Sequence, residues 1–286
     1  MSLYLVPPLF AVLLWWFATA AVLLLDGLPR ATFTASMLAG TAVLAASLHV
    51  VRLSGADLTA GGAYVAFAAA LLAWAWVELG FYLGVLVGPR ARGKPVAAGA
   101  WRRFAQAVHA NLWHELAILL VGTAIALLLW HQPNRLALRT FVALALMHES
   151  ARLNVFLGVP NLNEAWLPPH LAFLAGFMRR RPMNVLFPLS VTAGTVAMVV
   201  LFAGASAAAP AAATGAMLLG TLLLLGVLEH WMLVLPLPFA RLWDGALRLR
   251  AAMAALPGRR WASRWSIMRR PVLAAAACRE SEWRGR

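Results

Sequence analysis

The sequence predicts an all-α, polytopic membrane helix bundle, and three observations carry that prediction. Of the 286 residues, 63% are hydrophobic and only 12% are charged, whereas a soluble domain carries about 25% charged residues. The mean hydropathy is +0.78. The apolar residues form long blocks, and a helix needs roughly 20 of them to cross a bilayer core. Backbone groups in lipid must be bonded within their own segment, which favours helices over strands.

About seven such blocks can be drawn, and each predicts one transmembrane helix. The first lacks the basic start and small-residue exit of a cleavable signal peptide, so it counts as a span. A further apolar stretch, residues 171–178, is too short to cross and predicts a segment at the membrane interface. The Ala-rich stretch 205–213 predicts a loop. The predicted spans are residues 3–25, 32–53, 59–87, 108–130, 136–157, 185–207 and 214–235.

The basic residues predict an N-out, C-in orientation. The formal net charge is +14, and the Lys and Arg residues gather after the third, fifth and seventh blocks. With seven spans these groups fall on one side, as the positive-inside rule requires of the cytoplasmic side. The predicted organisation is a bundle over residues 1–240 and a basic cytoplasmic or interfacial tail over residues 241–286. The expected partner of this charge is anionic lipid, and no nucleic-acid role is expected.

Ionisable residues inside the apolar blocks point to function. A charge at the centre of a membrane helix costs about 2.5–3.5 kcal/mol on insertion scales. Such groups must therefore be paired, protonated, hydrated or bound to a ligand. They are Glu78 in the third block, His114 and Glu115 in the fourth, His148 and Glu149 in the fifth, and Glu229 and His230 in the seventh.

The predicted topology brings all of these groups to the cytoplasmic half of the membrane. The loop after the fifth block adds polar residues on the same side. Convergence from four spans predicts one shared polar site. Its candidate members are Glu78, His114, Glu115, His148, Glu149, Arg152, Asn154, Asn163, Glu164, His170, Glu229 and His230.

Four interpretations of this site stay open. In the first, it is an internal ion-pair network in which Arg152 neutralises Glu149 at i,i+3 and contacts His148 at i,i+4. In the second, it is a metal centre for iron, zinc or manganese. In the third, one histidine ligates a tetrapyrrole, and in the fourth the site is a proton or solute pathway. The candidate metal ligands are His114, Glu115, His148, Glu149, Glu164, His170, Glu229 and His230.

Adjacent His and Glu residues complicate the metal interpretation. Neighbouring side chains on a helix diverge by about 100°, so only one member of each pair faces a common point. The other member is expected to meet a supporting partner. The sequence has neither of the spacings, His-x-x-x-His and His-Glu-x-x-His, that put two ligands on one helix face.

Several motifs resemble the PuhE family of photosynthetic complex assembly proteins. They are HESARLNVFLGVPNLNE (148–164), LPPHLAFL (167–174), RRRPMNVLFP (179–188), LEHWMLVLPLP (228–238) and the shorter WHE (113–115). The resemblance extends from about residue 74 to residue 242 and leaves the basic tail unmatched. Ser150 and Ala151 depart from the larger or more polar pair expected after His-Glu.

The resemblance implies a multi-pass protein of the inner (intracytoplasmic) membrane of an anoxygenic phototrophic bacterium. It further implies a role in the assembly of the reaction centre and its antenna, and in bacteriochlorophyll supply, with complex subunits or pigment as partners. The competing hypothesis is a membrane-embedded metalloenzyme that acts on a pigment precursor, quinone or carotenoid. Metal analysis discriminates between them.

Overall fold

Helices make up the regular structure of the part of the chain that can be described. A computed structural model describes residues 2–89, 99–162, 167–235, 245 and 248. Among these residues there is no strand, and one isolated bridge joins Val159 to Arg180. The all-α class is thereby confirmed. The helices are α1 (Ser2–Asp26), α2 (Phe33–Ser54), α3 (Ala60–Tyr82), α4 (Ala100–Ala110), α5 (Leu112–Leu128), α6 (Leu136–Leu157), α7 (Leu186–Ala205) and α8 (Pro210–Met232), with 3-10 segments η1 (Arg30–Thr32) and η3 (Pro169–Phe177).

Each of the seven predicted spans contains one helix of the bundle. Five of them, α1, α2, α3, α7 and α8, are long and apolar enough to cross a membrane, and the bent pair α4–α5 makes a sixth if it forms one span. Helix α6 has 22 residues but carries Arg139, Glu149 and Arg152, so composition alone does not mark it as a span. The number of seven crossings and the N-out orientation stay predictions.

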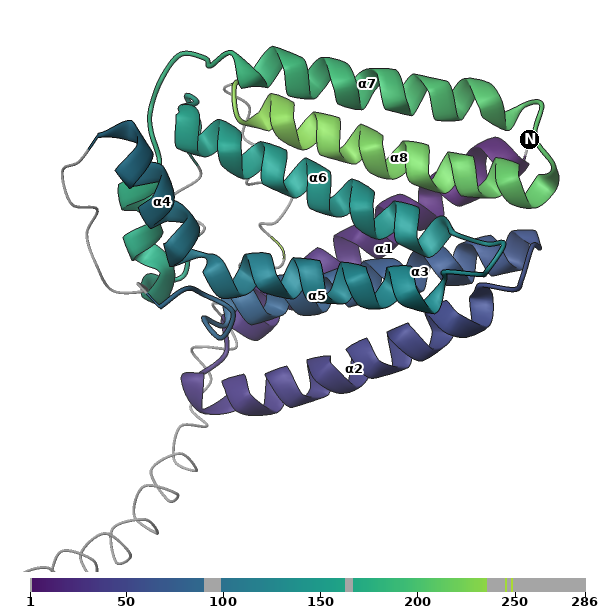
Figure 1. Ribbon diagram of the computed structural model, residues 1–286, viewed down its shortest axis with the longest axis horizontal. Helices are drawn as coiled ribbons and strands as arrows, with labels where there is room; N and C mark the ends of the chain where they lie inside the picture. Colours follow the sequence, from purple (N-terminus) through teal and green to yellow (C-terminus); the bar gives the residue numbers. More distant parts are fainter. Residues whose placement is uncertain (1, 90–98, 163–166, 236–244, 246–247, 249–286) are drawn as a thin grey trace, which may run out of the picture.

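The helices lie side by side (Figure 1), and among the candidate spans α3 and α8 are the most buried. Helix α3 contacts α1, α2, α5, α6 and α8, and α8 contacts α1, α3, α6 and α7. Helices α2 and α7 lie on opposite sides of the bundle and are mostly exposed along their length. The exposed apolar side chains on these helices suit contact with lipid.

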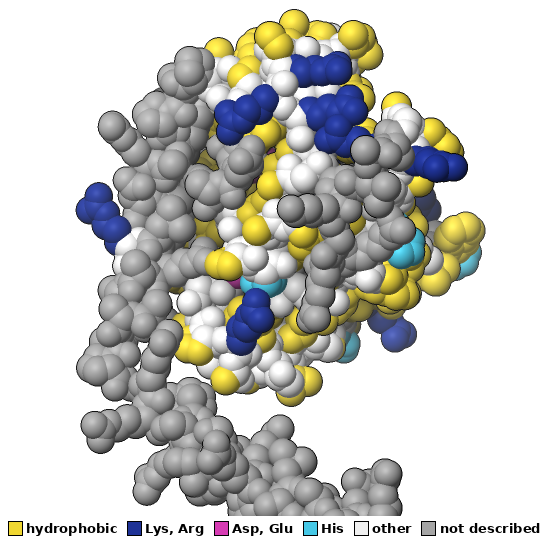
Figure 2. Space-filling model, turned by 90° about the vertical axis from the view of Figure 1, so that its left-hand side faces the viewer, with side chains coloured by type: hydrophobic (Ala, Val, Ile, Leu, Met, Phe, Trp, Pro, Cys, Tyr) yellow, Lys and Arg dark blue, Asp and Glu magenta, His cyan; other side chains and the backbone are white. Residues whose placement is uncertain are grey.

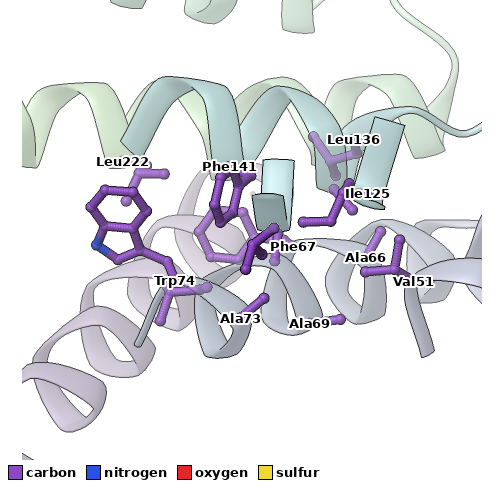
Figure 3. Close-up of a cluster of buried hydrophobic side chains, with 14 of the residues drawn as sticks. Val51, Ala66, Phe67, Ala69, Ala73, Trp74, Ile125, Leu136, Phe141 and Leu222 are labelled. Atoms are coloured by element: carbon purple, nitrogen blue, oxygen red, sulfur yellow. The ribbon is translucent and has the colours of Figure 1, made fainter. Parts of the chain in front are cut away.

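The core between the helices is built from alanines and branched aliphatic residues, with a few aromatic rings among them (Figure 3). Ala66, Ala69 and Ala73 on α3 let neighbouring helices approach closely, which membrane helices achieve through small residues at their contacts. Phe141 of α6 is 1% exposed and packs edge-to-face on Trp74, with ring centroids 5.6 Å apart. This core holds α3, α5 and α6 in a fixed register just beside the polar residues.

The structure corrects three boundaries. The predicted fourth span, 108–130, is not one helix, because the chain bends by 62° between α4 and α5. At the bend the Asn111 side chain donates to the Ala107 carbonyl. The third span ends at Tyr82 rather than residue 87, since Gly84 adopts φ +75°. The predicted Ala-rich loop, 205–213, is shorter than expected and covers residues 206–209, because α7 ends at Ala205 and Pro210 starts α8. At the first helical position the missing N–H of proline costs nothing, and the alanines that follow are the best helix formers.

Helix α4 and η3 pack together at one end of the bundle. Their small core contains Val87, Ala110, Leu171, Leu174 and Phe177. The apolar stretch 171–178 therefore folds as a short 3-10 segment rather than a membrane-crossing helix.

Exposed arginines surround the same end, which faces the viewer in Figure 2. Arg30, Arg102, Arg180 and Arg181 are exposed there. This clustering is what the sequence predicts for the cytoplasmic end. Of the predicted tail, 241–286, only positions 245 and 248 lie within the described residues.

Gly88 provides a test of how α4 is held. Its N–H donates to the Ala110 carbonyl at 2.7 Å, and a Cβ there would collide with the backbone carbonyl of His109. We expect Gly88→Ala to displace α4 and to lower the free energy of unfolding by about 1–3 kcal/mol, the usual cost of overpacking. The matched control is Gly99→Ala, where an added Cβ meets nothing within 4 Å. Equal thermal unfolding temperatures in detergent would contradict this docking.

Candidate functional site

Glu78, His148 and His114 form a continuous row of polar groups across three helices. His148 Nδ1 on α6 lies 3.3 Å from Glu78 Oε1 on α3. On its other side, His148 Nε2 lies 3.2 Å from His114 Nε2 on α5. His148 therefore bridges a carboxylate and a second imidazole. One potential ligand atom from each residue falls within 4.8 Å of the other two.

Aromatic rings fix the two imidazoles in place. Trp74 packs edge-on against His148 with ring centroids 5.3 Å apart, and Phe81 packs against His114 at 4.8 Å. Both aromatic residues belong to α3, the helix that carries Glu78. His114 is 0% exposed. A ring packed this tightly has few alternative orientations, so the row is held by the fold.

A second group beside this row is centred on Arg152. Its Nη1 lies 2.5 Å from Glu115 Oε1 on α5 and 3.0 Å from Glu149 Oε1 one turn back on α6. The i,i+3 contact between Glu149 and Arg152 was expected from the sequence. The expected i,i+4 contact with His148 is absent from the described ion pairs and hydrogen bonds, because His148 turns toward Glu78 and His114.

Two cavities meet at this polar wall. The larger, of about 580 Å³, lies among α3, α4, α5, α6 and η3, and the smaller, of about 250 Å³, lies among α1, α3, α6 and α8. Glu78, Tyr82 and His148 line both cavities, and Glu229 lines the smaller one. The larger cavity also reaches Glu115, Glu149 and Arg152. The row Glu78–His148 thus forms part of the partition between the two cavities.

His230 and Asn154 belong to a different network. His230 Nδ1 donates to the Gly226 carbonyl at 2.8 Å, and its Nε2 lies 2.9 Å from Ser150 Oγ. Asn154 Nδ2 donates to the Ser150 carbonyl and to Ser190 Oγ. These hydrogen bonds join α6, α7 and α8. Because both ring nitrogens of His230 have partners within the protein, His230 has no free nitrogen to bind a ligand.

The remaining candidates also lie apart from the row. His170 Nε2 donates to the Tyr82 carbonyl at 2.7 Å, which ties η3 to the end of α3. Asn163 and Glu164 lie outside the described residues. Among the described residues, one group could hold a metal ion. It consists of His114 and His148 from the predicted ligand set together with Glu78, which the sequence placed in the polar core but not among the ligands.

Sequence reasoning missed three residues that shape the site. Ser150 and Ser190, 2.7 Å apart through their hydroxyls, connect His230 to α7. Tyr82 lines both cavities. The departure at Ser150 from the resembling motif was the one signal that could have identified the serine pair, because a small hydroxyl residue fits where α6, α7 and α8 meet.

Comparisons with known proteins place the chain in a family. A family model described as "Protein of unknown function (DUF3623)" matches residues 1–254. A curated relative from Rhodobacter capsulatus, the "Uncharacterized 30.4 kDa protein in puhA 5'region", is 38% identical over 241 residues. That match covers 82% of this chain and 88% of the relative. No solved structure matches the chain.

Ser150→Ala tests the His230 network. The substitution removes the hydroxyl beside His230 Nε2 and leaves that buried ring nitrogen without its partner, a loss of about 1–3 kcal/mol in unfolding free energy. Ser206→Ala is the control, because the exposed Ser206 hydroxyl bonds only the local carbonyl of Ala203. Thermal unfolding in detergent, followed by tryptophan fluorescence, should show a clear loss for Ser150→Ala alone. An equal response from the two variants would contradict the network.

Proposed function

We propose that this chain, which belongs to the DUF3623 family, is an integral membrane factor for assembly of the photosynthetic reaction centre and antenna and for bacteriochlorophyll supply. The observation that carries the proposal is the relative in Rhodobacter capsulatus, whose name places it in the 5′ region of puhA. The resemblance of this chain's own His-Glu and Arg-rich motifs to the PuhE family supports the same assignment. The proposed location is the bacterial inner, intracytoplasmic membrane.

The larger cavity supports a role in handling a lipid-soluble molecule. Its volume of about 580 Å³ lies within the usual range of small-molecule sites, roughly 300–1,000 Å³. Most of its wall is apolar, with Phe81, Phe104 and Phe156 among the lining residues, and one side carries Glu115, Glu149 and Arg152. An amphiphile such as a pigment or its precursor, with a polar head and an apolar body, matches this division.

The exposed helices support contact with partner subunits in the membrane. Helices α2 and α7 present apolar side chains along opposite sides of the bundle, including Leu38, Val43, Leu189 and Val200. In this proposal, subunits of the photosynthetic complexes dock on such faces while the cavity delivers or receives pigment at the end of the bundle.

A second candidate function is a membrane-embedded metalloenzyme that acts on a pigment precursor, quinone or carotenoid. One observation favours it, the convergence of Glu78, His114 and His148. Imidazole and carboxylate together suit zinc, iron and manganese.

A deletion and complementation experiment tests the proposal. In a phototrophic bacterium that carries this gene, the deletion strain should lose most reaction-centre and antenna absorbance in isolated membranes. Wild-type protein should restore it, and so should His131→Ala, because His131 is exposed at the far end of the bundle. His148→Ala should fail to restore it although the variant protein accumulates in the membrane.

Two outcomes would count against the proposal. A deletion strain with wild-type pigment content and complex absorbance would remove the assembly role. Full complementation by His148→Ala would keep a role in assembly but separate it from the polar row.

A further inference from the structure

We propose that Glu78, His114 and His148 bind one divalent first-row transition-metal ion, of the zinc or iron class. The three residues come from α3, α5 and α6, and one ligand atom of each lies within 4.8 Å of the others. Two imidazoles and a carboxylate are the ligand set of many three-residue metal sites in proteins. The inference does not depend on the assembly role, because metal binding is measured on the purified protein.

The spacing of the imidazoles suits a shared ion. Metal–nitrogen bonds of about 2.0–2.1 Å in a tetrahedral site separate two ligand nitrogens by roughly 3.3–3.4 Å. His114 Nε2 and His148 Nε2 lie 3.2 Å apart. A direct N–H···N hydrogen bond also has this length. The distance alone therefore does not distinguish a hydrogen bond from a shared ion, and the groups around the two imidazoles must decide.

Those surroundings favour the ion. Glu78 Oε1 is buried and, although His148 Nδ1 lies 3.3 Å away, it accepts no hydrogen bond from the described residues. His114 Nδ1 likewise has no hydrogen-bond partner among them. Buried polar atoms are nearly always satisfied, and an exception calls for a missing water or ion. His114 itself is 0% exposed. A cation bound to Glu78 would compensate a buried carboxylate whose only ion-pair contact among the described residues is with the His148 imidazole.

The charge balance points in the same direction. When Glu78, Glu115 and Glu149 are all ionised, they carry three negative charges, and Arg152 offsets one of them through its two ion pairs. Glu229 adds a further carboxylate on the wall of the smaller cavity. Because each uncompensated charge in a membrane helix costs about 2.5–3.5 kcal/mol, a divalent ion that cancels two negative charges would stabilise the end of the bundle.

The proposed ion would be reachable from the larger cavity. Glu78 and His148 both line that cavity, whereas structural zinc sites are closed by four protein ligands. Three protein ligands beside a cavity leave a coordination position for water or for a donor atom of a bound amphiphile. His230 is excluded as a ligand because Gly226 and Ser150 already engage both of its nitrogens.

Cobalt titration tests the site directly. Protein purified with a tag that contains no histidine, stripped with a chelator and titrated with CoCl₂, should develop visible d–d absorbance at one equivalent. Zinc chloride should displace it. Elemental analysis of protein purified without chelator should give about one zinc or iron per chain, as three strong ligands require.

Matched variants identify the ligands. His114→Ala, His148→Ala and Glu78→Gln should each weaken cobalt binding by more than about 100-fold, beyond the roughly 10–100-fold loss caused by removing a supporting partner. His131→Ala, exposed at the far end, and His230→Gln, buried with other partners, should keep wild-type binding.

The wild-type titration decides the proposal even if a variant fails to fold. Absence of d–d absorbance in folded wild-type protein, or cobalt binding that survives in folded His114→Ala and His148→Ala, overturns it. Loss of binding in His131→Ala would mean that cobalt binds elsewhere and would overturn it as well. None of these results bears on pigment content in the deletion strain, so the two proposals fail separately.

Discussion

The cost of ionisable side chains inside an apolar bundle is the constraint on which the rest of this structure depends. Arg152 of α6 contacts Glu115 of α5, and His148 of α6 lies between Glu78 of α3 and His114 of α5. Each contact removes part of a penalty of about 2.5–3.5 kcal/mol per charge. Because lipid tails are as apolar as leucine, burial of apolar surface alone does not fix how such helices rotate against each other. The polar contacts between α3, α5 and α6 supply that specificity.

The same groups define the interior space of the molecule. The wall that contains Glu78 and His148 separates a cavity of about 580 Å³ from one of about 250 Å³. Helix α4 and η3 lie across the end of the larger cavity, and exposed arginines surround that end. A lipid-soluble molecule in the larger cavity would therefore meet charged groups on one side and apolar rings on the others. Assembly and metal-dependent roles both draw on this arrangement.

The sequence predicted the helices, the gathering of ionisable residues toward one end of the bundle, and the contact between Glu149 and Arg152. Apolar blocks and i,i+3 spacing are local properties, so they can be recognised in the sequence. It could not say which member of each His-Glu pair faces the shared site. On α6, His148 joins the row while Glu149 meets Arg152, and on α5 His114 is buried while Glu115 reaches across to α6. These rotations are set by packing, for example of Phe141 against Trp74. For the same reason the bend at Asn111 and the Ser150–His230 contact were not predicted.

A double-mutant cycle across α5 and α6 tests whether the Glu115–Arg152 ion pair joins these helices in the folded protein. We expect the unfolding free energies of Glu115→Gln, Arg152→Met and the double variant to be non-additive by about 1 kcal/mol or more, as for residues in contact. Glu115→Gln combined with Arg139→Met, which has no ion pair with Glu115 among the described contacts, should be additive. Additivity within about 0.5 kcal/mol for Glu115 and Arg152 would mean that the two charges do not meet in the folded protein and that polar contacts do not fix these helices.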